Sequence, residues 1–180
     1  MDTFETIVRE QPLLKGLTPG QLEEIADCAS FVRFDKGDFL FREGEFARRF
    51  YILTSGKVAI EIFTPGRGPV IVETLDEGDL LGWSWLFEPY RWHFDAMAQT
   101  EVKAVAFDAL CMRGKCDQDH TLGYELVKRF SQIIMERLQS TRLTLLDVYG
   151  TVPDNDVVAA AEVMVTTAKD SPNGKAGGER

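Results

Sequence analysis

The 180-residue sequence predicts a mainly β fold, a double-stranded β-helix or jelly roll with flanking helices and a long C-terminal dimerisation helix. Two observations carry this prediction. Short segments with strand-like patterning follow one another between residues 31 and 107, separated by glycine-containing turns such as Lys36-Gly37-Asp38. After them, apolar residues recur at steps of three and four from Thr121 to about Val148, which is the spacing of an amphipathic helix.

Residues 1–30 are expected to form N-terminal helices. Thr18 is a suitable N-cap residue, Pro19 fits the first helical turn, and Gln21 can bond back to the cap as in a capping box. We expect this helix to end near Ser30, where the pattern changes from helix to strand.

Residues 31–108 are expected to form the β-roll. Val58, Ile60 and Ile62 alternate with residues of the opposite face, as in a strand with one buried side. Many short strands with regular glycine turns favour an antiparallel roll. The predicted strands are Phe31–Phe34, Phe39–Arg42, Phe50–Thr54, Lys57–Phe63, Val70–Leu75, Phe94–Ala98 and Val102–Phe107.

Residues 109–149 are expected to be helical, with Asp108 capping a short helix over Ala109–Lys115 that precedes the long one. Part of the apolar stripe on the long helix can pack on the roll, and the remainder predicts a homodimer because the helix is longer than so small a roll. Packing of the whole stripe on the roll is the alternative. Residues 150–180 are expected to hold a short helix and a disordered tail. The stripe consists of Leu126, Val127, Phe130, Ile134, Leu138, Thr141, Leu145 and Val148.

The charge and cysteine content restrict the partners and the location. A formal net charge of −9 leaves no excess of Lys and Arg to neutralise phosphates, so no direct nucleic-acid partner is expected. The apolar runs are far shorter than the roughly 20 residues that a membrane span requires, so no membrane partner is expected. Three cysteines without a C-x-x-C pair indicate reduced thiols and a cytoplasmic protein.

No catalytic or metal site is predicted. Cys111, Cys116 and His120 match no zinc-binding spacing, and the whole chain has two histidines. No nucleophile elbow or Ser-His-Asp set is present in the sequence. We therefore expect no metal, no cofactor and no enzyme activity.

The glycine pattern, taken as a set, resembles a known family. Lys36-Gly37-Asp38, Phe41–Glu45, Phe50–Gly56 and Glu77-Gly78-Asp79 before Leu81-Gly82 occur in this order and spacing. From Pro12 to Gly150 the chain resembles the cyclic-nucleotide-binding domain of the Crp/Fnr family, the catabolite activator protein fold. The resemblance implies a pocket for cAMP or cGMP built by a phosphate-binding cassette. In that cassette a helix N-terminus and an arginine hold the phosphate, and a glutamate accepts the ribose hydroxyl.

The corresponding cassette segment here is residues 81–98, and its chemistry differs from the family pattern. Gly82 matches, whereas Trp83 stands at the glutamate position and cannot accept a hydrogen bond from a ribose hydroxyl. Arg91 is the only arginine of the segment, but counting back from the strand Val102–Phe107 places Trp92 at the arginine position. The sequence therefore leaves open whether Arg91 or Trp92 takes the arginine position. The candidate ligand-binding residues are Leu81, Gly82, Trp83, Ser84, Arg91, Trp92 and His93.

The resemblance implies a regulatory sensor. Only 30 residues follow Gly150, too few for the family's winged helix-turn-helix, so we expect a stand-alone homodimer that binds a small anion such as cAMP, cGMP or a related nucleotide. Ligand binding would be transmitted through the long helix to an unidentified protein partner. The alternative is a degenerate dimeric interaction module, in which Trp83 and its aromatic neighbours fill the pocket instead of stacking on a purine.

Overall fold

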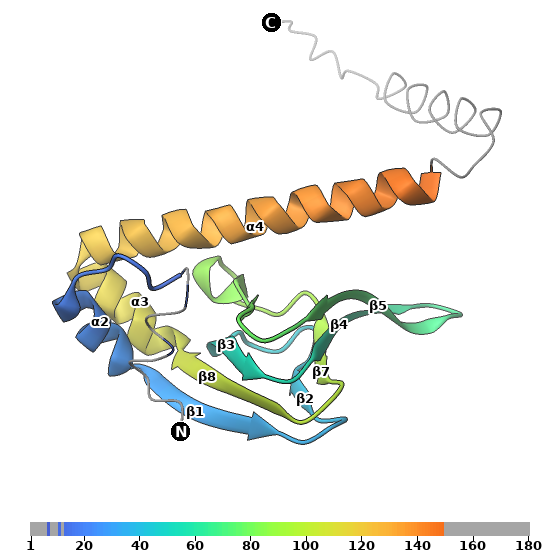
Figure 1. Ribbon diagram of the computed structural model, residues 1–180, viewed down its shortest axis with the longest axis horizontal. Coiled ribbons are helices and arrows are strands. Elements are labelled where there is room, and N and C mark those ends of the chain that lie inside the picture. The colour runs from blue at the N-terminus through green and yellow to red at the C-terminus, as the bar shows by residue number, and fades with distance from the viewer. Residues whose placement is uncertain (1–6, 8–10, 12, 150–180) are drawn as a thin grey trace, which may run out of the picture. The chain divides into compact units, whose positions relative to one another are not determined.

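The computed structural model describes residues 7, 11 and 13–149, and within them two four-stranded antiparallel sheets form a roll (Figure 1). One sheet has the order β1-β8-β3-β6 and the other β2-β7-β4-β5. The predicted jelly-roll class is confirmed. The strands are β1 (Ala29–Phe34), β2 (Phe39–Phe41), β3 (Arg49–Ser55), β4 (Val58–Thr64), β5 (Gly68–Leu75), β6 (Leu80–Leu81), β7 (Asp95–Ala98) and β8 (Val102–Asp108). The helices are α2 (Pro19–Ala26), the 3₁₀ turn η1 (Ser84–Leu86), α3 (Ala109–Gln118) and α4 (His120–Tyr149).

Each of the seven predicted strands is present, with bounds that differ by at most two residues. The sequence pattern missed β6, because Leu80 and Leu81 are too few to show any periodicity. This short strand pairs with Tyr51 and Ile52 of β3 and leads directly into the cassette segment.

Helix α2 begins as the sequence predicts. The Thr18 hydroxyl accepts from the Gln21 amide at 3.3 Å, and the Gln21 side chain accepts from the Thr18 amide at 3.1 Å, which completes a capping box. The expected end near Ser30 is wrong, since the helix ends at Ala26. Strand β1 begins at Ala29, which pairs with Phe107 of β8, and this sheet pairing ends the helix earlier than local propensity suggests.

A cluster of four buried aromatic side chains joins the β1-β8-β3-β6 sheet to η1 and α4. Phe50 of β3 stacks on Phe107 of β8 at 4.6 Å and on Trp85 of η1 at 5.0 Å between ring centroids. Phe130 of α4 contacts Phe50 and Trp85 edge-on at 5.4 and 5.6 Å. Burial of such rings is a large apolar contribution to stability, so this cluster fixes η1 and the first half of α4 against the roll.

The β3–β4 turn requires glycine at position 56. Gly56 has φ of +91°, and a Cβ atom there would lie 2.1 Å from the carbonyl oxygen of Glu101. The turn therefore packs directly on the backbone of the β7–β8 turn, and a side chain would separate the two turns.

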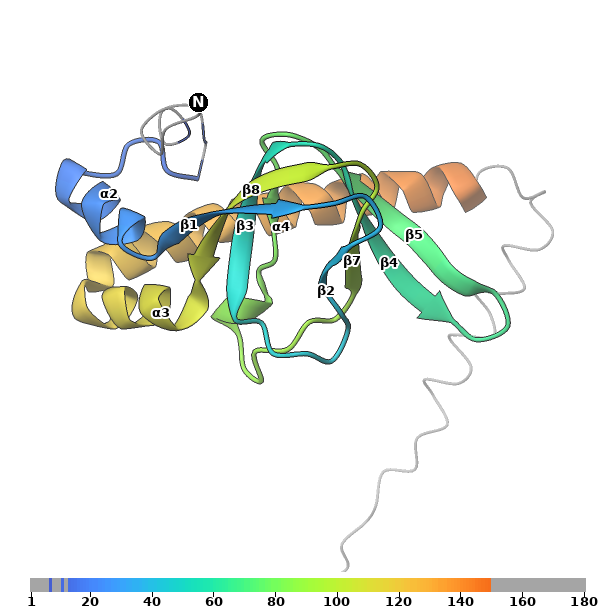
Figure 2. The same cartoon turned by 90° about the horizontal axis from the view of Figure 1, so that it is seen from below.

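The chain divides into two compact units, residues 1–131 and 132–180, and α4 runs through the boundary. In the first unit α2 and α3 lie together at one end of the roll (Figure 2), and Leu122, Leu126 and Phe130 of α4 are buried. In the second unit the described side chains include Leu138, which is 49% exposed. No described helix is long and apolar enough to cross a membrane.

The residues of the predicted apolar stripe of α4 therefore differ in burial. Leu126 and Phe130 are core residues of the first unit, whereas Val127 and Leu138 are exposed and Ile134 is half-buried. The side chains of Leu145 and Val148, and the predicted helix and tail in 150–180, lie outside the described residues.

The prediction of reduced thiols is wrong for two of the three cysteines. Cys28, which precedes β1, forms a disulfide with Cys111 of α3, and their Cα atoms are 5.7 Å apart. The pairing of β1 with β8 brings them together, since β8 leads into α3 and the Asp108 amide donates to the Cys28 carbonyl at 2.9 Å. A separation of 83 residues concealed this contact in the sequence. The cysteine argument for a cytoplasmic location is thereby lost.

Thiol titration tests the cysteine assignment. Burial raises the pKa of the Cys116 thiol and the charges of Asp117 and Asp119 raise it further, so the native protein should react slowly with a thiol reagent at neutral pH. Unfolded without reductant, the chain should show one reactive thiol, and three after reduction. The Cys116→Ser variant should show none before reduction. Three thiols in the unreduced, unfolded protein would contradict the disulfide.

Candidate functional site

The cassette segment lies between β6 and β7 and is held to the β2–β3 loop by backbone pairing. The Ala47 amide donates to the Tyr90 carbonyl at 2.7 Å, and the Trp92 amide donates to the Glu45 carbonyl at 2.9 Å. The Gly44 amide returns a bond to the Trp92 carbonyl at 2.9 Å. Residues 90–92 and 44–47 are thus paired in a short antiparallel ribbon, which fixes the directions of Arg91 and Trp92. Tyr90, with φ of +55°, does not follow this alternation.

Trp92 points into the roll. Its side chain is 5% exposed and stacks on Phe41 of β2 with ring centroids 3.7 Å apart and planes 9° from parallel. The same ring lies on Gly82, where an added Cβ atom would be 2.6 Å from the indole and the backbone has φ of +91°. Only glycine permits this contact. The cassette glycine is therefore covered by an indole that comes from the far end of the same segment.

Arg91 points the other way. It is exposed, its Nη1 donates to the carbonyl of Gly44, and its guanidinium lies 4.1 Å from the ring centre of Phe46. Successive side chains of an extended segment face opposite sides, so Trp92 occupies the inward position and Arg91 the outward one. Of the two residues, Trp92 and not Arg91 faces the cassette glycine Gly82.

The other predicted ligand residues are distributed over both sides of the segment. Leu81 and Ser84 are buried, Trp83 is half-buried, and His93 is exposed. Trp85 belongs to the aromatic core, so it offers no stacking face to a ligand. The structure thus brings Gly82 and Trp92 together, directs Arg91 elsewhere and leaves His93 exposed.

Acidic and basic groups near the segment are engaged with each other. The Asp95 carboxylate accepts from the Glu43 amide at 2.6 Å and lies 4.0 Å from the Arg42 guanidinium, which also covers the ring of Phe39 at 3.6 Å. Within the described residues no group of three His, Cys, Asp or Glu side chains could hold a metal ion. The segment therefore offers an aromatic contact surface at Gly82, and its one arginine, Arg91, lies over Phe46 and is bonded to Gly44 instead.

A match to a protein-family model shows which known proteins the chain is related to. Residues 31–119, which include the whole roll after the first two residues of β1, match the model of the cyclic nucleotide-binding domain. Over these residues the chain matches the cyclic nucleotide-binding domain family. The resemblance that the glycine pattern indicated is confirmed.

Individual relatives are regulatory proteins that are longer than the matched segment. The chain is 37% identical to human cGMP-dependent protein kinase 2 over 82 residues, which are 45% of this chain and 11% of the kinase. It is 26% identical to a CRP-like cAMP-activated global transcriptional regulator of Mycobacterium tuberculosis over 148 residues, 82% of this chain and 64% of the regulator. The chain thus spans less than two thirds of either protein.

The fold is also shared with solved structures. A cyclic nucleotide-binding domain from Methylobacillus flagellatus superposes with a TM-score of 0.70 at 14% identity, covering 84% of this chain and 86% of that one. At this identity the likeness concerns the fold alone. It places the roll and its flanking helices in the architecture of the cyclic nucleotide-binding domain.

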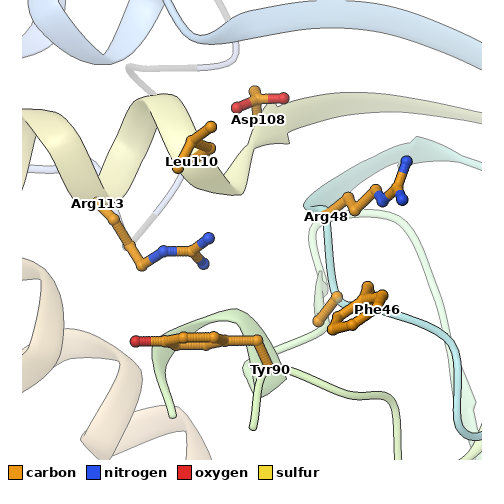
Figure 3. A pocket seen from close by; sticks show the side chains of 7 residues that line it. Phe46, Arg48, Tyr90, Asp108, Leu110 and Arg113 are labelled. Atoms are coloured by element: carbon orange, nitrogen blue, oxygen red, sulfur yellow. The ribbon is translucent and has the colours of Figure 1, made fainter. Parts of the chain in front are cut away.

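A cleft of about 480 Å³ lies on the outer side of the cassette segment of this cyclic nucleotide-binding domain (Figure 3). We call it the outer cleft. Sequence analysis missed it, because it is formed by the β2–β3 loop, the cassette and the start of α3, which are far apart in the chain. Its lining residues are Phe46, Ala47, Arg48, Tyr90, Asp108, Leu110 and Arg113.

Removal of the indole should cost stability. The Trp92→Ala variant should lower the free energy of unfolding by about 3–5 kcal/mol, as is usual for loss of a buried aromatic ring. Phe87→Ala, in the same segment at a ring that is 54% exposed, should change it by less than about 0.5 kcal/mol. Urea unfolding of both variants measures the difference. Equal losses would mean that Trp92 is not packed on Gly82 and Phe41.

Proposed function

We propose that this chain is a regulatory sensor domain that binds a small anionic ligand, such as cAMP, cGMP or a related nucleotide, at the inner face of the cassette segment. The supporting observation is the shape of that segment, in which a left-handed Gly82 leads into the η1 turn between β6 and β7. The names of the relatives support it as well, since one is a cGMP-dependent kinase and another a cAMP-activated regulator. A catalytic role is not part of the proposal.

Binding at this face requires the indole of Trp92 to leave Gly82 and Phe41. The free energy of that stacking is subtracted from the binding energy of the ligand, and Trp83 supplies no charged acceptor for a ribose hydroxyl. Arg91, the next residue, carries four further N–H donors beyond its bond to Gly44 and can approach a phosphate only if the ribbon shifts. We therefore propose weak binding of cyclic nucleotides.

The second candidate is an interaction module that binds no nucleotide. The packing of Trp92 against Gly82 and Phe41 favours it, because the indole already fills the place in front of the cassette glycine. For both candidates we propose that the chain forms a homodimer through α4 and that α4 transmits its signal to a protein partner. No nucleic acid is part of the proposal. A cytoplasmic location remains part of the proposal.

Thermal melting with cyclic nucleotides separates the two candidates. A ligand that binds only the folded state raises its stability by about 2.7 kcal/mol at one hundred times Kd, so cAMP or cGMP at about 10 mM should raise the melting temperature if the sensor proposal is correct. Trp92→Arg should increase the shift, because it restores an inward cation and removes the indole. Trp92→Ala is the matched control that removes the indole only. No shift in the wild type or in either variant would exclude the sensor proposal in favour of the interaction module.

The proposed dimer is tested on the second half of α4. Replacing Ile134 and Leu138 together by Glu would place four like charges in a symmetric helix pair, and the dimer should dissociate while urea unfolding of the roll is unchanged. The control variant carries Glu at Gln132 and Gln139, exposed polar positions of the same helix, and should remain dimeric. Sedimentation velocity at about 10 µM measures both, and a monomeric wild type there would contradict the proposal.

A further inference from the structure

We propose that the outer cleft is a binding site for a small organic anion that carries a flat ring. Arg113 and Arg48 would hold its phosphate or carboxylate. Tyr90 and Phe46 would contact its ring. This site differs from the inner face of the cassette, and the proposal stands whether or not a cyclic nucleotide enters the roll.

Arg113 is fixed in position before any ligand arrives. Its Nη1 donates to the carbonyl of Trp85 at 2.9 Å, and its guanidinium lies 4.3 Å from the ring centre of Tyr90. Figure 3 shows this guanidinium above the Tyr90 ring. An arginine held by one N–H and a ring face retains its other donors in a defined orientation, so little conformational entropy is lost when an anion binds.

The second cation, Arg48, comes from the other side of the cleft. Its side chain is exposed, and among the described residues no carboxylate oxygen lies within 4 Å of the guanidinium of Arg48 or Arg113. Its backbone is fixed to α3, because the Ala109 amide donates to the Arg48 carbonyl at 2.9 Å. Arg48 and Arg113 both line the cleft of a chain of net charge −9. Figure 3 shows the Arg48 guanidinium directed away from that of Arg113, so the exposed Arg48 side chain would turn toward a bound anion. Both guanidinium groups attract an anion electrostatically.

The one acidic lining residue does not cancel this charge. An Asp108 carboxylate oxygen accepts from the Cys111 amide at 2.8 Å and caps α3, so this group is engaged at the helix end. A helix N-terminus also carries partial positive charge, which partly compensates the carboxylate. The cleft therefore keeps an excess of positive charge.

The apolar walls select the body of the ligand. Phe46 is 53% exposed and Tyr90 is half-buried, and both rings line the cleft together with Leu110, which is 74% exposed. Large exposed apolar side chains gathered beside cations favour a ligand with a flat ring and one anionic end. The volume of about 480 Å³ lies within the range of small-molecule sites. An inorganic anion alone would leave these walls in contact with water.

The experiment titrates the ¹⁵N-labelled full chain with 5′-AMP, inorganic phosphate and adenosine, and follows backbone amide shifts. 5′-AMP, which has both a phosphate and a flat ring, should give saturable shifts at Ala47, Tyr90 and Leu110. Phosphate should bind more weakly at the same amides, and adenosine should bind at least tenfold more weakly than 5′-AMP. Arg48→Ala should weaken 5′-AMP about tenfold, the usual effect of losing a charge-assisted hydrogen bond. Arg49→Ala removes the adjacent exposed arginine that does not line the cleft, and should leave the affinity unchanged.

Other variants keep this proposal separate from the sensor proposal. Arg113→Lys retains the positive charge but loses the planar, two-pronged guanidinium, so it should weaken the affinity for 5′-AMP. The melting temperature of this variant shows whether it remains folded. Trp92→Arg alters the inner face only and should not change binding in the outer cleft. Saturable shifts centred on Gly82 and Ser84 in place of the cleft amides would overturn the proposal. So would the absence of saturable shifts up to about 10 mM 5′-AMP, or equal affinity for adenosine and 5′-AMP.

Discussion

The stacking of Phe50 on Phe107 and Trp85 is the contact on which the other parts of the first unit depend. Phe50 and Phe107 lie on paired strands, Trp85 lies in η1, and Phe130 of α4 closes the cluster from the helical side. Since α3 follows directly from β8, the position of Phe107 also sets where α3 begins. One buried aromatic cluster thus positions the roll, the cassette and the helices that follow it.

In the cassette, the alternation of side chains along extended backbone places an indole and a guanidinium on opposite sides of the segment. The ribbon between 90–92 and 44–47 makes the side chains of Arg91 and Trp92 face opposite sides. Trp92 therefore meets Gly82 inside the roll, and Arg91 meets Phe46 outside it. A shift of one residue would exchange the indole and the guanidinium, so the inner face lacks an arginine because of register and not because the segment has none.

Features that depend on local pattern could be predicted from the sequence. The capping box at Thr18 and the strand positions follow from residue type and alternation within a few residues, and the glycine set was specific enough to indicate the family. The disulfide between Cys28 and Cys111 and the outer cleft could not be predicted, because their residues meet only after β1 and β3 have paired with β8. The early end of α2 has the same cause. Sheet pairing at Ala29 overrides the local preference for helix.

The two faces of the cassette share one backbone segment, and this has a consequence for regulation. Tyr90 lines the outer cleft, Arg91 is bonded to Gly44, and Trp92 lies on Gly82, so three successive residues contact three different surroundings. The ribbon bonds at Ala47, Glu45 and Gly44 tie these contacts together. A ligand that shifts the ribbon backbone would alter the hydrogen bonds that position Tyr90 beside Arg113, whereas a change confined to the Trp92 side chain leaves these backbone bonds in place. By linkage, if a ligand at one face changes the affinity for a ligand at the other face through the ribbon, the second ligand changes the affinity for the first by the same factor. In this domain the ribbon is therefore the structural element through which events at the two faces would be coupled.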